Sequence, residues 1–516
     1  MTSIHRNDVW DLVPLPPGKK AITSKWVFKT KPSLPGTPPR LKARLVARGF
    51  QQKQGIDFDE VFAPVVKWST IRTLTARAAK YGHEIHHLDV KTTFLYGRLD
   101  EEVYMAQPQG FIESGTKHLV CKLKKSLYGL RQSPRAWYAC INAYLLSQGF
   151  TRSDSDHNLY YKGLGDNKTI LVVYVDDLFV TGGNKADIAW IIQQLQNRFD
   201  ITKLGLVHKY IGVEFVHLPH GIFLHQTPYI LQILEDSGML DCRPEHVPLP
   251  AGLHLFTDMN SPPINSTLYC QLVGKLIFLT TTRPDLAFSV GLVSRFMTQP
   301  QQAHLDVVHH ILRYVKKTAT YGLFYSRHDT NTIQGFTDAD WAACGETRKS
   351  TGGYCFTFAG AAITWQSKRQ PTVAKSSTES EYVSLSTGAS EATWLRRLLH
   401  EILPSSAQLN SSISLSLTSP QIRTDLQLFP PISVFCDNQS AIKLAKNPVF
   451  HARTKHIEIH HHFVRERVLR GEIDLHYIST DSQPADIFTK PLSRTKFELH
   501  RTALGIICLS SVVHNS

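Results

Sequence analysis

The chain has 516 residues, which corresponds to about three or four domains of roughly 150 residues each. Hydrophobic residues make up 42% and charged residues 19%, and this composition excludes a disordered or collagen-like chain. The 57 basic and 43 acidic residues give a net charge of +14, which indicates a polyanionic partner, either nucleic acid or a membrane surface.

The basic excess is concentrated near the start of the chain, where residues 19–53 carry ten basic side chains and no acidic one. An ordinary solvated surface can carry such a run, so this alternative stays open. No stretch approaches the roughly 20 apolar residues of a membrane-spanning helix, and MTSIHRNDVW lacks the apolar core of a secretion signal. The eight cysteines form no CxxC pair. We therefore expect an intracellular protein with reduced thiols and no membrane partner.

Several elements can be predicted in chain order. Residues 22–29 alternate as a strand does, with 41–46 as the hairpin partner. Residues 170–175 and 178–181 predict two apolar strands joined at an Asp-Asp corner, and a helix should follow through Ile188, Ile191, Ile192, Leu195 and Phe199. Residues 251–267 favour a linker. A second α/β pattern starts near Ile333, with its longest helix at 379–402 and a long loop or insertion at 404–431.

A first group of carboxylates lies at strand ends and corners. Asp89 follows a short apolar strand, and Asp176 and Asp177 occupy the corner of the apolar hairpin. Adjacent carboxylates in such a place repel each other and are costly to desolvate unless divalent cations neutralise them. Two Mg²⁺ ions about 4 Å apart would activate an attacking hydroxyl and stabilise a leaving oxygen in phosphoryl transfer. Asp also favours ordinary β-turns, so the pair alone does not decide the role.

The residues around this pair resemble a known family. Tyr174-Val175-Asp176-Asp177 resembles the YxDD box of reverse transcriptases, and the neighbouring blocks are similar to the Pol region of copia-type LTR retrotransposons. The blocks follow the family's order over about residues 8–505: SKWVFKTK, LKARLVARGFQQKQGIDFDEVFAPVVKWSTIR, LDVKTTFLYGRLDEEVYMAQPQGF, SLYGLRQSPRAWY, LVVYVDDLFVTG, KYIGVEF and LVGKLIFLTTTRPDLAFSVGLVSRFM. The resemblance implies an RNA-directed DNA polymerase that joins dNTPs on an RNA or DNA template-primer.

The resemblance also implies roles for single residues. Asp89 and Asp176 would bridge two Mg²⁺ ions (or Mn²⁺), with Asp177 as a third, more peripheral carboxylate. The remaining residues implied for substrate binding are Lys42 and Arg44 at the triphosphate, Phe94 as a steric gate against a ribose 2′-hydroxyl, Tyr128 and Gly129 at the nucleotide and template, and Tyr210, Ile211 and Gly212 as the primer grip. Surface solubility stays open for Lys42 and Arg44, and core packing for Phe94.

A second group of carboxylates matches the four acids of a ribonuclease H domain in the family's order: Asp338, Glu381, Asp437 and Asp486. Four acids around two Mg²⁺ ions would activate water to cut the RNA strand of an RNA–DNA hybrid. Local alternatives exist. Thr378-x-x-Glu381 fits a capping box, and Asp486 fits a helix start. Asp340 is an alternative to Asp338 as a metal-binding carboxylate, and Glu379 is an alternative to Glu381.

Three other motifs do not carry a function. Asp236-Ser237-Gly238 has the letters of an aspartic-protease motif but lies in a predicted helix. The histidines at 451, 456, 460, 461 and 462 lack the cysteine or carboxylate that would complete a tetrahedral zinc site. No GxxxxGK[ST] phosphate loop occurs, so ATP-driven chemistry is unsupported.

Together these features predict a multidomain α/β (α+β) protein, with a right-hand polymerase followed by a ribonuclease H-like domain. The expected divisions are 8–250 for fingers, palm and the start of the thumb, 251–333 for thumb, connection and linker, 334–492 for the nuclease, and 493–516 for a tail. Template-primer, hybrid, dNTPs and a Gag particle or integrase are the expected partners, in the cytoplasm with nuclear access. The alternative is an inactive nucleic-acid-binding remnant, since Gag, protease and integrase are missing and the insertion at 404–431 separates Glu381 from Asp437.

Overall fold

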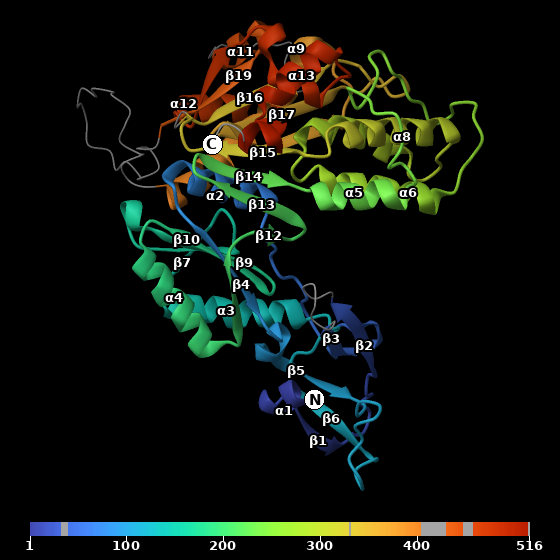
Figure 1. Cartoon of the computed structure of the whole chain (residues 1–516), viewed down its shortest axis with the longest axis vertical. Coiled ribbons are helices and arrows are strands. Elements are labelled where there is room, and N and C mark those ends of the chain that lie inside the picture. Colours follow the sequence, from blue (N-terminus) through green and yellow to red (C-terminus); the bar gives the residue numbers. More distant parts are fainter. Residues whose placement is uncertain (32–39, 330–331, 404–429, 447–457, 514–516) are drawn as a thin grey trace. The chain divides into compact units, whose positions relative to one another are not determined.

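The computed structural model describes residues 1–31, 40–329, 332–403, 430–446 and 458–513 (Figure 1). It divides into two compact units. The first unit comprises Met1–Val66, His86–Gly163 and Thr169–Gly205, and the second comprises Lys67–Ile85, Leu164–Lys168 and Leu206–Ser516. Most of the insertion expected at 404–431, together with His451 and His456, lies outside the described residues.

The first unit is built on a six-stranded sheet of order β11-β4-β10-β9-β8-β7, a three-stranded sheet β1-β6-β5 and the hairpin β2–β3. The strands are β1 (Trp10–Pro14), β2 (Ser24–Lys31), β3 (Arg40–Ala47), β4 (Ile85–Val90), β5 (Arg98–Met105), β6 (Leu119–Lys125), β7 (Thr151–Arg152), β8 (Leu159–Lys162), β9 (Thr169–Tyr174), β10 (Asp177–Gly182) and β11 (Ile201–Leu206). Its helices are α1 (Thr2–Arg6), α3 (Ser133–Ser147) and α4 (Lys185–Arg198).

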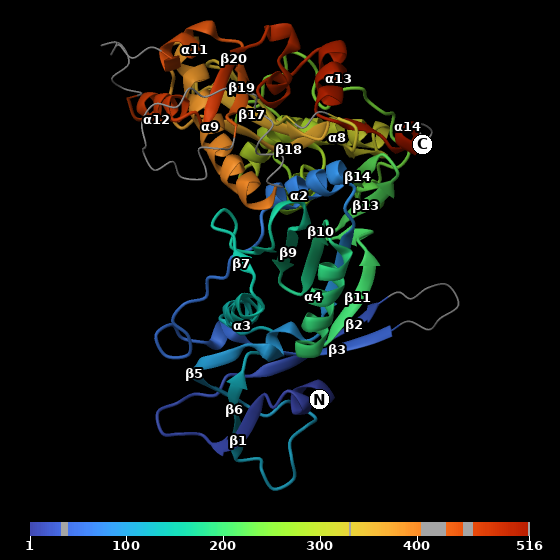
Figure 2. The ribbon, with the colours of Figure 1, turned by 90° about the vertical axis from the view of Figure 1, so that its left-hand side faces the viewer.

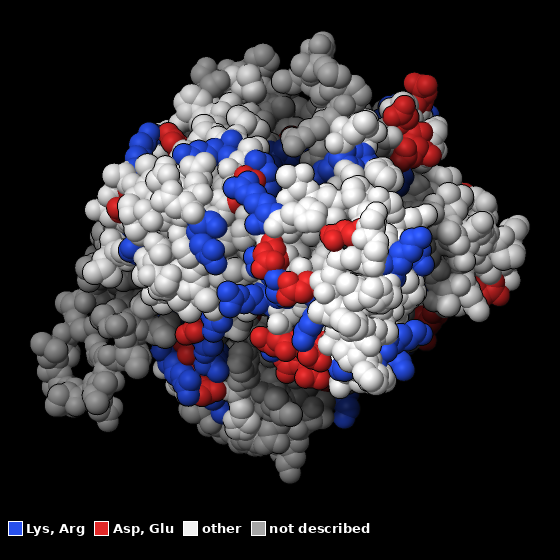
Figure 3. Space-filling model, turned by 90° about the horizontal axis from the view of Figure 1, so that it is seen from below, with Lys and Arg blue, Asp and Glu red and all other residues white. Residues whose placement is uncertain are grey.

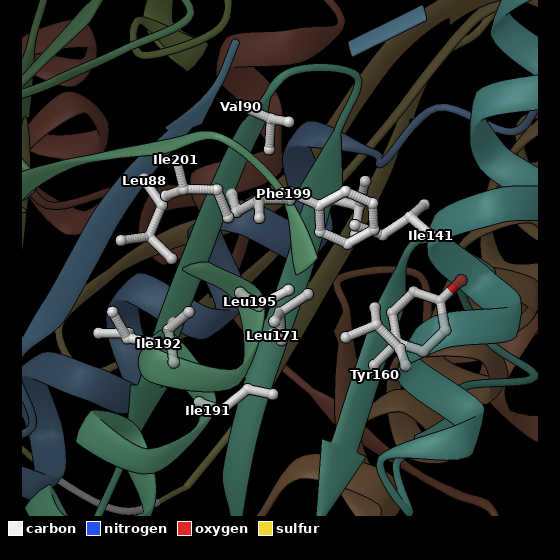
Figure 4. Packing of buried hydrophobic residues seen from close by; sticks show 14 of the residues in the cluster. Leu88, Val90, Ile141, Tyr160, Leu171, Ile191, Ile192, Leu195, Phe199 and Ile201 are labelled. Carbon is white, nitrogen blue, oxygen red and sulfur yellow. The ribbon is translucent and has the colours of Figure 1, made fainter. Parts of the chain in front are cut away.

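The core of this unit lies between the six-stranded sheet and helices α3 and α4 (Figure 4). Ile141 of α3 and Leu195 of α4 are buried together with Leu171 of β9. Helix α4 begins where Asn184 accepts a hydrogen bond from the backbone N–H of Ala186 at 2.9 Å, an N-cap that satisfies one of the free donors of the first turn. The two predicted strands and the helix that follows them are confirmed, with strand ends within one residue of those expected.

The second unit holds two five-stranded sheets, β12-β13-β14-β15-β21 and β18-β17-β16-β19-β20. The strands are β12 (Lys209–Tyr210), β13 (Val213–Leu218), β14 (Gly221–His225), β15 (Tyr321–Ser326), β16 (Gln334–Asp340), β17 (Thr351–Phe358), β18 (Ala361–Arg369), β19 (Ile432–Cys436), β20 (Ile473–Tyr477) and β21 (Ile506–Cys508). The helices are α2 (Trp68–Tyr81), α5 (Thr227–Asp236), α6 (Ser266–Leu279), α7 (Ala287–Val293), α8 (Gln302–Lys317), α9 (Ser377–Ile402), α11 (Gln439–Lys446), α12 (Glu458–Leu469), α13 (Arg494–Ala503) and α14 (Leu509–Val513).

One sequence interpretation is confirmed in this unit. Asp236 is the last residue of helix α5, so the Asp-Ser-Gly triplet does not lie in the strand-flanked loop of a protease. Within the linker expected at 251–267, residues 251–265 contain no helix or strand, but Ser266 and Thr267 already belong to helix α6. Among the described residues, no helix is long and apolar enough to cross a membrane.

Helix α2 precedes the first candidate aspartate in the sequence, yet it is packed into the second unit against β14 and β15 (Figures 1 and 2). Arg72 Nε donates to the carbonyl oxygen of Ile363 at 2.8 Å, and its guanidinium carbon lies 3.8 Å from the ring centre of Trp365. Arg77 Nε donates to the carbonyl oxygen of Ile402, also at 2.8 Å. Residues far apart in the sequence therefore complete this unit, while the domain boundaries expected at 250 and 333 stay predictions.

Candidate active sites

The YVDD segment forms a tight turn between two buried strands. Tyr174 pairs with Asp177, so Val175 and Asp176 are the two residues of the turn. Val175 has a φ of 52°, a left-handed conformation that is costly for a β-branched residue. Its carbonyl oxygen accepts a hydrogen bond from the indole N–H of buried Trp137 at 2.7 Å. The hydrogen bond from Trp137 therefore fixes the turn to helix α3.

Sheet order brings the first two candidate aspartates together. Strand β4, which carries Asp89, is the neighbour of β10, and the N–H of Val90 donates to the carbonyl oxygen of Asp176 at 2.8 Å. Burial raises the pKa of the Asp176 carboxyl, and the nearby carboxylates of Asp177 and Asp89 raise it further, while Arg44 opposes them. Carboxylates that repel each other in a half-buried place are suited to a divalent cation.

A cavity of about 590 Å³ opens in front of these two carboxylates. Asp89 and Asp176 line it together with Lys42 and Arg44 of strand β3 and the ring of Tyr128. The Arg44 guanidinium carbon lies 5.3 Å from the Tyr128 ring centre, within cation–π distance. Acidic and basic side chains therefore meet around one space, as binding of a metal-bound polyanion requires.

Gly129 explains how Tyr128 reaches this cavity. A Cβ on Gly129 would lie 2.1 Å from the carbonyl oxygen of Ala47, and its φ of +94° favours glycine. The close approach lets the N–H of Ala47 donate to the carbonyl oxygen of Tyr128 at 2.7 Å. The end of strand β3 is thereby fixed beside Tyr128, which places Arg44 next to the aromatic ring.

Like Gly129, the predicted residues Asp177 and Phe94 of the first unit do not line the cavity. Asp177 Oδ1 lies 2.8 Å from His87 Nε2 on strand β4. Phe94 packs edge-on against Tyr128, with ring centres 4.7 Å apart, and contacts the core of the unit. Thr92 and Leu95, on either side of Phe94 in the sequence, line the cavity, and Thr92 has a left-handed φ of 52°. Phe94 thus supports the ring of Tyr128 in this structure.

The predicted primer-grip residues belong to the second unit. Ile211 and Gly212 have φ values of 46° and 78° and form the two-residue turn between β12 and β13. Tyr210 is buried, and its ring centre lies 6.4 Å from that of Trp68 on helix α2. Packing of Tyr210 against helix α2 therefore supports the turn.

Hairpin β2–β3 gathers cations on one of its two faces. Its register places Lys29 opposite Lys42 and Val27 opposite Arg44, and Lys25 lies on the same face, so at least four cations share it. Like charges directly opposite each other destabilise a hairpin, and a bound polyanion would relieve this. Acids elsewhere in the chain offset part of the basic run, because Lys19 Nζ lies 3.9 Å from Glu102 Oε2. On the face shown in Figure 3, basic and acidic side chains are interleaved.

The second group of carboxylates gathers at the ends of two parallel strands. Thr337 of β16 pairs with Cys436 of β19, so Asp338 and Asp437 follow at equivalent positions. Glu381, in the second turn of helix α9, accepts a hydrogen bond on Oε1 from the N–H of Ala339 at 3.2 Å. Three of the four predicted acids are therefore brought to one point by the sheet and the helix that covers it.

Burial dominates the electrostatics of this group. Asp338 is 2% exposed, and burial raises the pKa of its carboxyl to about 7, with Asp486 and Asp437 adding to the shift and Lys490 opposing it. Burial, and then Asp338 and Asp437, raise the pKa of Glu381 well above its usual value. Oε2 of Glu381 is buried and has no hydrogen-bond partner among the described residues. An unpaired buried carboxylate oxygen beside two other carboxylates fits a divalent cation.

The fourth acid, Asp486, is fully buried and ion-paired. Its two oxygens lie 2.9 Å from Lys490 Nζ and 2.8 Å from Lys496 Nζ. Lys490 Nζ also lies 3.8 Å from Asp338 Oδ2, which accepts a hydrogen bond from the hydroxyl of Thr489. No motif in the sequence marks Thr489, Lys490 or Lys496 as part of the site. The only signal for Lys490 was its position four residues after Asp486, a common helical spacing for an ion pair.

The start of helix α9 decides between the local alternatives for Glu379 and Glu381. The helix cap is Ser376, whose hydroxyl accepts from the N–H of Glu379 at 3.2 Å, and Glu379 Oε2 accepts from the N–H of Lys375 at 2.8 Å. The alternative in which Thr378 and Glu381 form a capping box is therefore wrong, because the helix cap lies two residues before Thr378. Glu379 is used at the cap, and Glu381 points to the carboxylates. Asp486 begins no long helix, since it lies in the short 3₁₀ segment Pro484–Phe488.

Comparison with known proteins shows which class of protein this chain resembles. The family described as reverse transcriptase (RNA-dependent DNA polymerase) matches residues 7–251. The Pol polyprotein of the tobacco transposon TNT 1-94 (Nicotiana tabacum) is 41% identical over 98% of this chain and 37% of its own length. That of transposon RE1 from Arabidopsis thaliana is 38% identical over 97% of this chain and 33% of its own length. A putative transposon Ty5-1 protein of Saccharomyces cerevisiae is 33% identical over 58% of this chain and 98% of that protein.

The chain belongs to the copia-type Pol polyproteins of retrotransposons. It spans about a third of the length of the plant polyproteins it matches. Among solved structures, the N-terminal RNase H domain of Rv2228c from Mycobacterium tuberculosis, fused to maltose-binding protein, covers 34% of this chain and 96% of that chain at 10% identity. Its TM-score of 0.21 is too low to establish a shared fold.

Proposed function

We propose that this chain is an RNA-directed DNA polymerase with a second site that cleaves the RNA strand of an RNA–DNA hybrid. The observation that carries the proposal is the cavity in which Asp89 and Asp176 face Lys42 and Arg44. Membership of the reverse transcriptase family supports it. The substrates are dNTPs, template-primer and hybrid, and a Gag particle or integrase would be a partner of the longer polyprotein.

In the polymerase site, Asp89 and Asp176 would hold Mg²⁺. Asp177 would orient His87, which lies on the same strand as Asp89. The bound metal supplies charge neutralisation and an activated primer hydroxyl. Arg44 and Lys42 would attract the triphosphate, because cations beside a half-buried cavity concentrate anions there. Tyr128 would contact the nucleotide, and Phe94, which packs against it, would be the steric gate that keeps a ribose 2′-hydroxyl out of the site. From the family resemblance, the turn at Tyr210 and Gly212 of the second unit would be the primer grip.

In the nuclease site, Asp338, Glu381 and Asp437 would hold the metal, which supplies an activated water. Asp437 is oriented by the hydroxyl of Thr480, which donates to its Oδ2 at 2.7 Å. Asp486 would act through Lys490 and the electrostatics of Asp338. Both sites must accept any sequence, so recognition would rely on the phosphate backbone and on duplex shape.

The test is primer extension by the purified full chain with Mg²⁺, dNTPs, oligo(dT) and poly(rA). We expect extension by the wild type and a loss of more than about 100-fold in Asp176→Asn, since changes to groups that merely support a metal ligand already cost about 10–100-fold. Asp200→Asn is the matched control, because that carboxylate pairs with Lys91 at 2.9 Å on the surface. The control should extend normally.

The competing function is that of a nucleic-acid-binding remnant without activity. It predicts no extension by the wild type while labelled template-primer still binds in a filter or anisotropy assay. Equal extension by wild type and Asp176→Asn would contradict the assignment of the catalytic carboxylate. Loss of activity in Asp200→Asn to the same degree would show that the assay reports folding rather than catalysis.

A further inference from the structure

A buried thiol lies among the nuclease carboxylates. Cys436 is the last residue of strand β19 and directly precedes Asp437. Its Sγ, one oxygen of Glu381 and one oxygen of Asp437 all lie within 4.8 Å of one another. The thiol is fully buried, and the N–H of Asn438 donates to its sulfur at 3.4 Å. A thiol, which prefers soft metal ions, therefore lies beside two carboxylates, which prefer hard ones.

A second feature of the same cluster points to a ligand. Glu381 is 6% exposed, and its Oε2 is buried without a hydrogen-bond partner among the described residues. Leaving a carboxylate oxygen buried and unpaired is unfavourable, and a cation would remove the penalty. Mg²⁺ satisfies carboxylates but has little affinity for sulfur, so it would leave the thiol unused.

We propose that Glu381, Cys436 and Asp437 form a binding site for a thiophilic divalent cation, Zn²⁺ or Cd²⁺, which excludes Mg²⁺ and blocks the nuclease. Sulfur, imidazole and carboxylate ligands are those that Zn²⁺ takes in proteins. Ligand atoms that share one zinc ion lie roughly 3.6 Å apart for Zn–S of about 2.3 Å and Zn–O of about 2.1 Å. The present separations, within 4.8 Å, therefore close by small side-chain rotations.

Binding of the cation changes no oxidation state and therefore needs no oxidant or reductant. The S–H bond of Cys436 breaks, its proton leaves to water, and the sulfur lone pair forms the bond to the metal. The two carboxylates bind as anions. That the cation binds depends only on Glu381, Cys436 and Asp437. That binding blocks cleavage (the inhibition half of the proposal) rests on the proposed nuclease function.

Binding is tested with Cd²⁺ alone, because a cadmium–thiolate bond gives a charge-transfer absorption in the ultraviolet. The full chain is titrated with Cd²⁺ as wild type, Cys436→Ser and Cys355→Ser. Cys355 is the matched control, a fully buried thiol on strand β17 of the same sheet. We expect the absorption of one thiolate to disappear in Cys436→Ser and to persist in Cys355→Ser. The same absorption in all three proteins would overturn the site.

Asp437→Asn provides a second variant that keeps the thiol, in case Cys436→Ser does not fold. It should weaken Cd²⁺ binding by at least about 10-fold, as loss of a ligand does when even supporting groups cost that much. Unchanged Cd²⁺ affinity in Asp437→Asn would also overturn the site. Circular dichroism of each variant confirms that the fold is retained.

Inhibition is tested by adding Zn²⁺ or Cd²⁺ to hybrid cleavage supported by Mg²⁺. The wild type should be inhibited at concentrations at least about 10-fold lower than Cys436→Ser, since the thiolate is the ligand that distinguishes soft from hard ions. Equal sensitivity of the two proteins would overturn the inhibition half. If the wild type cleaves nothing, the proposed nuclease function fails, and the Cd²⁺ absorption still decides whether the metal site exists.

Discussion

The two carboxylate sites differ in how the chain balances their negative charge. In the first unit, Asp89 and Asp176 are half-buried, and the nearest cations of strand β3 stand around a cavity of about 590 Å³. In the second unit, Asp338 and Asp486 are almost fully buried, and Lys490 lies within ion-pair distance of both.

This difference shows what each site needs from its ligands. The proposed polymerase site leaves room between its acidic and basic side chains, where a metal-bound triphosphate would lie. In the proposed nuclease site, Lys490 lies beside the acids, because burial in a low dielectric makes unpaired carboxylates costly. We therefore expect perturbations of the first site to act mainly on substrate binding and those of the second to act also on stability.

The largest effect is expected from Gly129→Ala, which tests whether close packing holds Arg44 and Tyr128 together. The new Cβ would overlap the carbonyl oxygen of Ala47 and would sit at a φ of +94°. We expect the free energy of unfolding to fall by about 3 kcal/mol or more, combining a backbone clash with a left-handed penalty of about 1–2 kcal/mol. Urea denaturation measures this.

Gly110→Ala is the matched control for that change. Gly110 has a similar φ of +82°, but a Cβ there meets nothing within 4 Å. It should cost only the left-handed penalty of about 1–2 kcal/mol. Equal losses in the two variants would show that the contact between Gly129 and strand β3 has no energetic role.

The buried acid of the second site should make stability depend on pH. In the folded chain the pKa of Asp338 is raised to about 7, so the folded state binds a proton that the unfolded state has already lost. Its stabilising effect is present at low pH and is lost as the pH rises from about 4 through 7. Without metal, this one group should lower the free energy of unfolding by about 3 kcal/mol between pH 5 and pH 8.

Urea denaturation of wild type and Asp338→Asn at the two pH values isolates this contribution. The variant should show a smaller decrease, because Glu381, whose pKa is also raised by burial, still contributes to it. Mg²⁺ should reduce the decrease in the wild type, because a bound cation favours the ionised carboxylate. The same pH dependence in both proteins would contradict the described environment of Asp338.

Lys490→Met should destabilise the second unit more than Lys496→Met does. Lys490 Nζ lies within ion-pair distance of both Asp338 and Asp486, whereas the ion pair of Lys496 Nζ at this site is with Asp486 alone among the described residues. Removing one partner of a buried pair costs about 3–5 kcal/mol, and partial exposure of Lys490 reduces this to about 2 kcal/mol. Thermal unfolding of both variants at pH 8 compares them. A larger loss in Lys496→Met would reverse the assigned roles.

The smallest effect is expected at the cations of the polymerase site. Replacing both Lys42 and Arg44 by Ala should raise the KM for dNTP by about 10-fold with little change in stability, because both side chains face an open cavity. The salt dependence of template binding should also become shallower as phosphate contacts are lost. Unchanged KM and unchanged salt slope would mean that this basic run is only a solvated surface.

The sequence predicted what depends on local pattern. The apolar hairpin β9–β10 and helix α4 follow from residue periodicity, and so do hairpin β2–β3 and helix α9. It could not decide the register of a helix start, because Ser376 and Thr378 both fit a cap and only the folded backbone selects Ser376. Strand alternation also did not reveal that the cations of β2 and β3 lie opposite one another, since that needs the pairing register.

Contacts between distant segments were beyond the sequence for a physical reason. Lys490 and Lys496 are long, flexible side chains, and nothing local indicates that both end on Asp486. Likewise, the amphipathic pattern of helix α2 does not say which unit it covers, and its place depends on hydrogen bonds from Arg72 to residues 281 and 363. The matched family blocks supplied the identity of the acids, and the geometry supplied their partners.

The central claim is that one chain holds two independent phosphoryl-transfer sites. It is tested most directly by measuring primer extension and hybrid cleavage on the same preparations of wild type, Asp176→Asn and Asp437→Asn. We predict that Asp176→Asn loses extension and retains cleavage, and that Asp437→Asn shows the reverse. Loss of both activities together in either variant, or of neither in both, would contradict the account.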